Sequence, residues 1–140
     1  MNWWVAALFS AVFAAATSIL AKIGIKDINS NLATAIRTVV ILVFAWGIVL
    51  FQGTYKELFS LNKTTIIFLV LSGIATGLSW LFYFRALQLG EASKVVPIDK
   101  LSLVLTIIMA FVFLKEKASL QVIFGAVLMT LGTLIISLAK

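Results

Sequence analysis

Long apolar runs separated by short polar segments make up almost the whole chain. The runs cover residues 3–25, 32–51, 64–89, 94–114 and 120–138. Each is close to the roughly 20 residues that an α-helix needs to cross a bilayer. Isolated strands cannot satisfy their backbone groups in lipid, and the runs lack the alternation of a barrel. The pattern predicts an all-α integral membrane protein, a bundle of five transmembrane helices in a single domain over residues 1–140.

Turn and capping residues stand between the runs. Polar residues 26–31 precede the second run, and Gln52 and Gly53 follow it. The only proline, Pro97, is expected in the first turn of the fourth helix, where its missing N–H costs least. The first run lacks the positive n-region of a signal peptide and is too long for an h-region, so we expect it to be retained.

The composition agrees with a membrane location and excludes several classes of chemistry. The chain is 63% hydrophobic and 11% charged, and it contains no Cys and no His. These absences exclude a disulfide framework, a Cys/His metal site and a serine activated by histidine, so we expect no enzyme, no metal and no cofactor. The net charge of +6 comes from basic residues scattered singly between apolar runs, which argues against nucleic acid as a partner.

The loop charges are nearly balanced between the two sides of the membrane. The side of the N-terminus carries Lys56, Lys63, Lys115 and Lys117 outside the helices. The opposite side carries Lys26, Lys94 and Lys140. The positive-inside rule needs a marked bias, which four against three does not supply. The chain is therefore expected to insert both ways round, or else in one orientation set by further charges at the helix ends.

Charged residues also lie inside the ends of the apolar runs. They are Lys22, Arg37, Arg85, Asp99 and Lys100. Such groups cost at least a few kcal/mol each in lipid and commonly face a cavity or a partner. Lys and Arg side chains can instead extend to the headgroups, whereas the short side chain of Asp99 cannot reach far for water. Asp99 is therefore the strongest functional candidate of the five.

Polar side chains form stripes on three of the expected helices. Asp99, Ser102 and Thr106 follow helical spacing on the fourth helix. The third helix carries Ser72, Thr76, Ser79 and Tyr83, and the first carries Ser10, Ala14, Thr17 and Ala21. Together the stripes are expected to line one water-accessible cavity. Alternatively, single hydroxyls bond between helices, a contribution of about 0.6 kcal/mol each.

Small and aromatic residues suggest contact faces. Gly73 and Gly77 form a GxxxG pattern, and Gly125 and Gly132 lie seven residues apart on the fifth helix, so both helices offer faces for close packing or dimer contact. Trp80 continues the face of Gly73 and Gly77. It is expected either to stack on an organic solute or a cation, or to pack against a neighbouring helix.

The second half of the chain resembles a known family of membrane proteins. Residues 82–97, with Phe113, Leu114, Lys115, Glu116 and Lys117 and the final Gly125 and Gly132 helix, resemble the EamA domain of the drug/metabolite transporter superfamily. The family pattern falls on Tyr83, Ala86, Leu87, Ala92, Ser93, Pro97 and Glu116, and Arg37 matches an early arginine of the second helix. The similarity extends over essentially the whole chain and is looser in the first two helices.

The resemblance implies a transporter built from repeats. Typical members carry two five-helix repeats of opposite topology and move metabolites, amino acids or drugs, mostly outward. This sequence has one repeat, so a second, inverted copy is expected to complete the transport path. The expected function is that of a secondary transporter, an exporter of a small metabolite or drug-like solute that works by alternating access. It is expected to act as an antiparallel, dual-topology homodimer in the bilayer of a bacterial or archaeal plasma membrane. The small multidrug resistance proteins are similar in logic, but their first helix carries a glutamate that is absent here.

The charges suggest a substrate class and leave two alternatives open. The excess of Lys and Arg indicates an anionic or zwitterionic solute, and protonation of Asp99, with Arg85 or Lys100 as partner, is a candidate for coupling transport to protons. One alternative is a flippase for a lipid-linked anionic headgroup, with phosphate held by the basic helix ends. The other is a non-transporting half that needs a distinct partner subunit.

Overall fold

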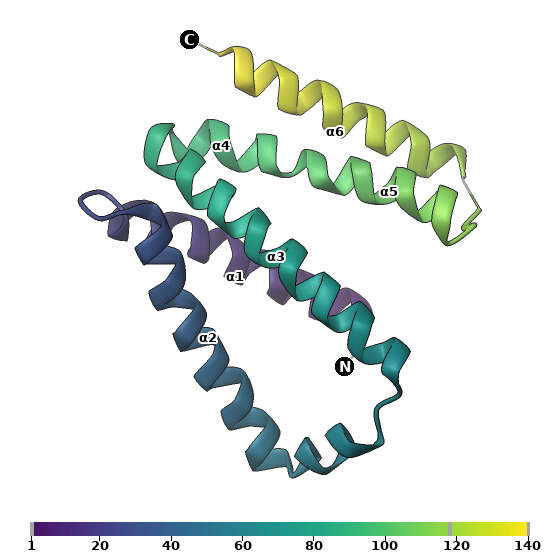
Figure 1. Ribbon diagram of the computed structural model, residues 1–140. Coiled ribbons are helices and arrows are strands. Elements are labelled where there is room, and N and C mark those ends of the chain that lie inside the picture. Colours follow the sequence, from purple (N-terminus) through teal and green to yellow (C-terminus); the bar gives the residue numbers. More distant parts are fainter. Residues whose placement is uncertain (1, 118, 140) are drawn as a thin grey trace. The chain divides into compact units, whose positions relative to one another are not determined.

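A computed structural model describes residues 2–117 and 119–139, and this part of the chain is helical without any strand (Figure 1). The elements are α1 (Trp3–Gly24), α2 (Ser30–Gln52), the short 3-10 helix η1 (Thr54–Ser60), α3 (Lys63–Leu89), α4 (Ala92–Asp99), α5 (Leu101–Phe113) and α6 (Leu120–Leu138). Five spans are long and apolar enough to cross a membrane, with α4 and α5 forming one of them. The expected all-α class is confirmed. Lys140, used above in the loop charges, lies outside the described residues.

Side-chain caps and a glycine set the ends of α2. The Asn29 side chain accepts from the backbone N–H groups of Asn31 (2.8 Å) and Leu32 (3.4 Å), so α2 begins at Ser30, two residues earlier than the apolar run. At the other end Gly53 adopts a left-handed conformation, with φ 71°, that other residues adopt at a cost. The following η1 segment was not expected from the apolar pattern, because it lies within a polar stretch.

The fourth span is interrupted where the sequence predicts one continuous helix. Pro97 is the sixth residue of α4, so its expected place in the first turn is wrong: the helix begins earlier, with the Glu91 carbonyl accepting from the N–H groups of Lys94 and Val95. Pro97 has no N–H to continue the regular ladder. The N–H of Lys100 is shared between the carbonyls of Val96 and Pro97, both at 3.1 Å, and α5 starts at the next residue.

The chain divides into two compact units, which are described separately. One contains the residues up to Ile19 and those from Leu89 onward; the other contains residues 20–88. In the first, α6 packs along α4 and α5 (Figure 1). Most large apolar side chains on the outer helix faces are exposed, which suits helices surrounded by lipid.

Three helix ends meet in the unit of residues 20–88. The end of α1, the start of α2 and the end of α3 contribute the most buried apolar side chains, which are Ala21, Ile25, Ala33, Phe84 and Leu87. Polar side chains of α1 and α3 cross this contact. Lys22 Nζ donates to the Leu87 carbonyl at 2.6 Å, and Gln88 Nε2 donates to the carbonyls of Ile25 (3.2 Å) and Ile28 (2.7 Å). These bonds satisfy carbonyls that a helix end leaves without an intrahelical donor.

Candidate functional site

A cavity of about 360 Å³ lies between α1 and the interrupted fourth span. All of its lining residues belong to the first unit. From α1 they are Ala7, Ser10, Ala11, Ala14, Ala15 and Ser18, and from the fourth span Val96, Lys100 and Leu103. The α1 wall consists of alanine and serine alone, so short side chains leave the volume open. Lys100 contributes the only formal charge among these residues.

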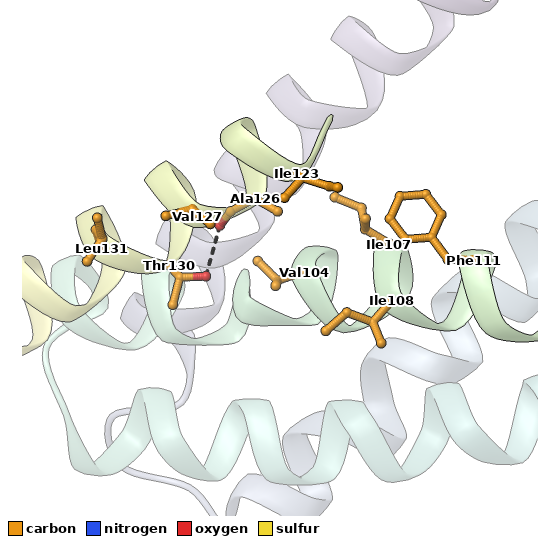
Figure 2. Close-up of a pocket in the computed structure, with 9 residues that line it drawn as sticks. All are labelled: Val104, Ile107, Ile108, Phe111, Ile123, Ala126, Val127, Thr130 and Leu131. Carbon is orange, nitrogen blue, oxygen red and sulfur yellow. Dashed lines mark hydrogen bonds between the residues drawn. The ribbon is translucent and has the colours of Figure 1, made fainter. Parts of the chain in front are cut away.

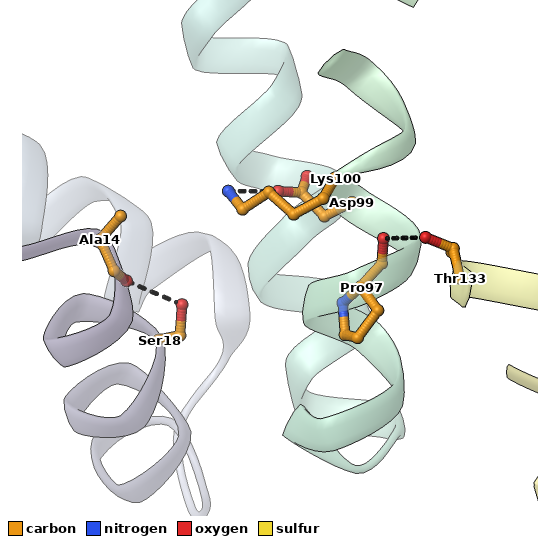
Figure 3. A network of polar contacts seen from close by, with 6 residues as sticks. All are labelled: Ala14, Ser18, Pro97, Asp99, Lys100 and Thr133. Atoms are coloured by element: carbon orange, nitrogen blue, oxygen red, sulfur yellow. Dashed lines mark hydrogen bonds and ion pairs between the residues drawn. The ribbon is translucent and has the colours of Figure 1, made fainter. Parts of the chain in front are cut away.

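Lys100 forms an ion pair with its neighbour Asp99 at the interruption of the span. Lys100 Nζ lies 3.4 Å from Asp99 Oδ2, and the side chains are 48% and 32% exposed (Figure 3). A pair of this exposure contributes little to stability. Its position is more informative, because ionisable groups inside a span usually mark a site rather than support the fold. The interruption is one residue long, because Lys100 keeps right-handed helical angles (φ −69°, ψ −7°) and its N–H still bonds to the Val96 carbonyl.

One bond ties α6 to the interrupted span beside this pair. Thr133, which is 8% exposed, directs its hydroxyl to the Pro97 carbonyl at 3.4 Å (Figure 3). On the facing wall, the Ser18 hydroxyl donates to the Ala14 carbonyl of its own helix at 2.9 Å. Next to the cavity, the bond from Thr133 to the Pro97 carbonyl holds α6 against the fourth span. Lys100 places a positive charge in the cavity lining.

The structure brings some of the expected site residues together. Ser10 and Lys100 line this cavity; Asp99 forms an ion pair with Lys100 but is not part of the lining. Thr17 is half-buried and is not part of the lining. The Thr106 hydroxyl donates to the Ser102 carbonyl at 2.8 Å, and Thr76 donates to Ser72 at 2.9 Å. These two hydroxyls bond to the preceding turn of their own helix.

Other expected site residues lie in the unit of residues 20–88. Trp80 is half-buried, and the Tyr83 ring stands edge-on to Phe84 with centroids 5.3 Å apart. Arg85 is exposed and donates to Gln88 Oε1 at 2.9 Å. Arg85 thus bonds to Gln88, which itself links α3 to the turn after α1. Of the two expected partners of Asp99, Lys100 is the one that forms an ion pair with it.

The four candidate packing glycines meet nothing close within the described chain. A Cβ built at Gly73, Gly77, Gly125 or Gly132 has no heavy atom within 4 Å, apart from chain neighbours and the backbone of its own helix. Their faces are therefore open in a single copy. Their role in contact between copies stays a prediction.

Sequence reasoning missed part of the α1 wall and the contacts of Gln88. Ser18 lies on the cavity face, whereas the expected stripe passed through Thr17 and Ala21. The alternating three- and four-residue spacing of the small residues from Ala7 to Ser18 is a signal that could have identified this face. Gln88 had no comparable signal, because its carbonyl partners are 60 and 63 residues away in sequence.

A second cavity in the same unit has different chemistry. It lies between α5 and α6, has a volume of about 430 Å³ and is lined by apolar side chains and Thr130 (Figure 2). The Thr130 hydroxyl already donates to the Ala126 carbonyl at 2.9 Å. This groove offers no charged group to a polar solute, so the cavity beside Lys100 is the better candidate site.

Comparison with known proteins identifies the family. The family model described as the EamA-like transporter family matches residues 1–138. A protein of Sinorhizobium sp named "Uncharacterized transporter in cobO 3'region" is 46% identical over 136 residues, which cover 97% of this chain and 96% of the relative. An uncharacterized protein of Methanocaldococcus jannaschii is 27% identical over 86 residues, covering 61% of this chain and 63% of that protein. No solved structure matches the chain. The resemblance carried by residues 82–97 is thereby confirmed, and the chain belongs to the EamA-like transporter family.

Proposed function

We propose that this membrane protein exports a small anionic or zwitterionic solute as a secondary transporter, with the cavity beside Lys100 as part of its binding site. The observation that carries the proposal is the charged pair Asp99 and Lys100 at an interruption of a membrane span, next to an open wall of alanine and serine. The family and the relative named as a transporter support transport rather than enzymatic catalysis.

The charges of the pair suit a solute with an anionic group. The Lys100 ammonium offers up to three donors to a carboxylate or phosphate group of the solute. Ser10 supplies a further hydroxyl on the opposite wall. A bare cation has less reason to bind here, since Lys100 is the charged residue in the lining.

Protonation of Asp99 provides a coupling step in this proposal. In this proposal Asp99 is protonated in one access state and ionised in the other, and its ion pair with Lys100 forms only when it is ionised. The change of access is then linked to a proton through one side chain.

Two inverted copies complete the transport path in this proposal, alternating between inward and outward access. The near balance of the loop charges supports insertion in both orientations, since neither side has a marked excess of Lys. The match to the Sinorhizobium relative covers 97% of this chain and 96% of that protein. The open glycine faces of α3 and α6 supply surfaces on which a second copy can pack closely.

Single-cysteine labelling tests the dual topology. Ser60 in η1 and Ser93 in α4 lie on opposite sides of the membrane in the expected topology, and the described chain has no native cysteine to compete. We expect both S60C and S93C to react with an impermeant maleimide from each side of the membrane, in intact cells and in inverted vesicles. Serine-to-cysteine changes keep every loop charge, so they leave the orientation unbiased.

Labelling of each introduced cysteine from one side alone would contradict dual topology. The transport path would then require a parallel assembly or a distinct inverted partner. A matched control adds positive charge on one side through Thr54→Lys together with Ser60→Cys. The added charge should shift the labelling at position 60 toward the cytoplasmic side if charge balance sets the orientation.

Replacement of Lys100 tests the binding role of the cavity. Lys100→Gln removes a charge-assisted contact worth roughly 1.5–3 kcal/mol, so solute affinity should fall about tenfold or more. Counterflow of labelled amino acids and sugar phosphates in proteoliposomes measures this effect. Lys94→Gln is the matched control, because Lys94 pairs with Glu91 on the same span and does not line the cavity. Equal counterflow by K100Q and K94Q would remove Lys100 from the site.

A further inference from the structure

Arg37 is a charged residue inside a membrane span, and it forms no ion pair within the described residues. It lies seven residues after Ser30, the first residue of α2, or about 10 Å along the helix at ~1.5 Å per residue. Neither of the two ion pairs within residues 2–117 and 119–139 includes it. Its Nε atom is buried and has no hydrogen-bond partner there. A buried donor of this kind normally has a partner.

Phe84 holds the guanidinium in place. The Arg37 Cζ lies 4.6 Å from the centre of the Phe84 ring, and Phe84 is 1% exposed. The ring therefore covers one face of the guanidinium through a cation–π contact. A contact with this face supplies no acceptor to the N–H groups, which lie in the guanidinium plane.

An apolar groove begins at the same guanidinium. Its volume is about 230 Å³, and it lies between the end of α1 and the start of α2. Its lining includes Leu20, Gly24, Ile25, Ala33, Ile36 and Arg37. Leu20 and Ile36 are 67% and 54% exposed, so the walls of the groove face the surrounding lipid. An apolar slot with one cation in its wall fits a molecule with an acyl chain and an anionic head.

The charges around this helix end favour an anionic head. Lys22, Lys26, Arg37 and Arg85 are basic and Asp27 is acidic in the segments that meet here, an excess of three positive charges. Basic pockets at helix ends attract acidic lipid headgroups more strongly than zwitterionic ones.

We propose that Arg37 and this groove form a binding site for an anionic phospholipid, with the phosphate on the guanidinium and part of an acyl chain between α1 and α2. The phosphate oxygens accept from the terminal N–H groups of the Arg37 guanidinium. None of the residues that line this groove lines the cavity beside Lys100, so the inference does not depend on the proposed transport.

Lipid binding to the purified full-length chain tests the site. Native mass spectrometry in detergent measures the occupancy of dioleoyl phosphatidylglycerol and of dioleoyl phosphatidylcholine. We expect the wild-type chain to retain phosphatidylglycerol in preference to phosphatidylcholine, and Arg37→Gln to lower phosphatidylglycerol occupancy about tenfold. Lys63→Gln is the matched control. It also removes one positive charge, but Lys63 is the first residue of α3, whereas Arg37 contacts Phe84 near the last turn of that helix. Equal loss in R37Q and K63Q, or none in either, would overturn the proposal.

A second variant distinguishes binding of a lipid from binding of a free anion, and it leaves the charge of Arg37 in place. Gly24 lines the groove, and a Cβ built there meets nothing within 4 Å, so Gly24→Leu should fill the slot without disturbing the backbone. We expect G24L to lose phosphatidylglycerol as R37Q does. Soluble glycerol phosphate, added in excess, should not displace the lipid. Retention of lipid by G24L together with displacement by glycerol phosphate would show a free-anion site instead, and the lipid proposal would fail.

Discussion

Replacing Asp99 with asparagine should abolish the stimulation of transport by a proton gradient while solute counterflow continues. In the proposed mechanism Asp99 is the group that changes protonation, and its carboxylate lies 3.4 Å from Lys100. Asparagine keeps the size of the side chain but can neither hold the lysine by charge nor take up a proton. Coupling free energies of roughly 1–3 kcal/mol correspond to about 5–150-fold in affinity, so the loss should be large.

The measurement is uptake of labelled anionic and zwitterionic solutes into proteoliposomes with and without a pH gradient. Asp27→Asn is the matched control, since it makes the same chemical change in the exposed turn between α1 and α2. It should leave the stimulation intact. A D99N protein with the wild-type response to the gradient would exclude Asp99 as the coupling group and leave Lys100 as a binding residue alone.

Phe84→Ala should destabilise the protein more than any other single apolar truncation in α3. Phe84 is almost fully buried where α1, α2 and α3 meet, and its ring also covers the Arg37 guanidinium. Removal of a buried phenylalanine ring costs about 3–5 kcal/mol, through lost packing and the cavity that remains. The loss of the cation–π contact adds to this because Arg37 stays charged inside the span.

Thermal unfolding in detergent, followed by tryptophan fluorescence, measures the destabilisation as a lower Tm. Phe82→Ala is the control, because Phe82 lies two residues away on α3 and is 76% exposed. It should change the Tm little. If F84A and F82A unfold at the same temperature, the contact of the three helix ends does not stabilise the protein as the buried side chains indicate.

Much of the secondary structure followed from local properties of the chain. An apolar run of about 20 residues favours a membrane span wherever its neighbours lie, because partition into lipid depends on composition and length. The end of α2 at Gly53 was also predicted, whereas the cap of α6 by Ser119, which accepts from the Val122 N–H at 3.3 Å, was not. The family pattern around Tyr83 and Pro97 was readable for the same reason, since its residues lie close together in sequence.

The interruption at Lys100 was only partly readable. Pro97 was expected in the first turn, where it leaves the helix intact, but the helix begins after Glu91, earlier than the apolar run, and Pro97 falls inside it. The polar stripes were ambiguous for a related reason. A hydroxyl such as that of Thr106 can bond to the preceding turn of its own helix, so helical spacing alone does not show whether it faces a solute.

The sequence by itself determined the membrane class, the spans, the family and the presence of ionisable groups near the helix ends, because these depend on residues close together in the chain. Only the tertiary structure decided which of those groups meet. Lys22 reaches a carbonyl 65 residues away, Arg37 lies over Phe84, and the small residues of α1 face Lys100. Hydrophobic periodicity shows which face of a helix avoids water; in lipid, where most faces are apolar, packing and a few hydrogen bonds select the partner.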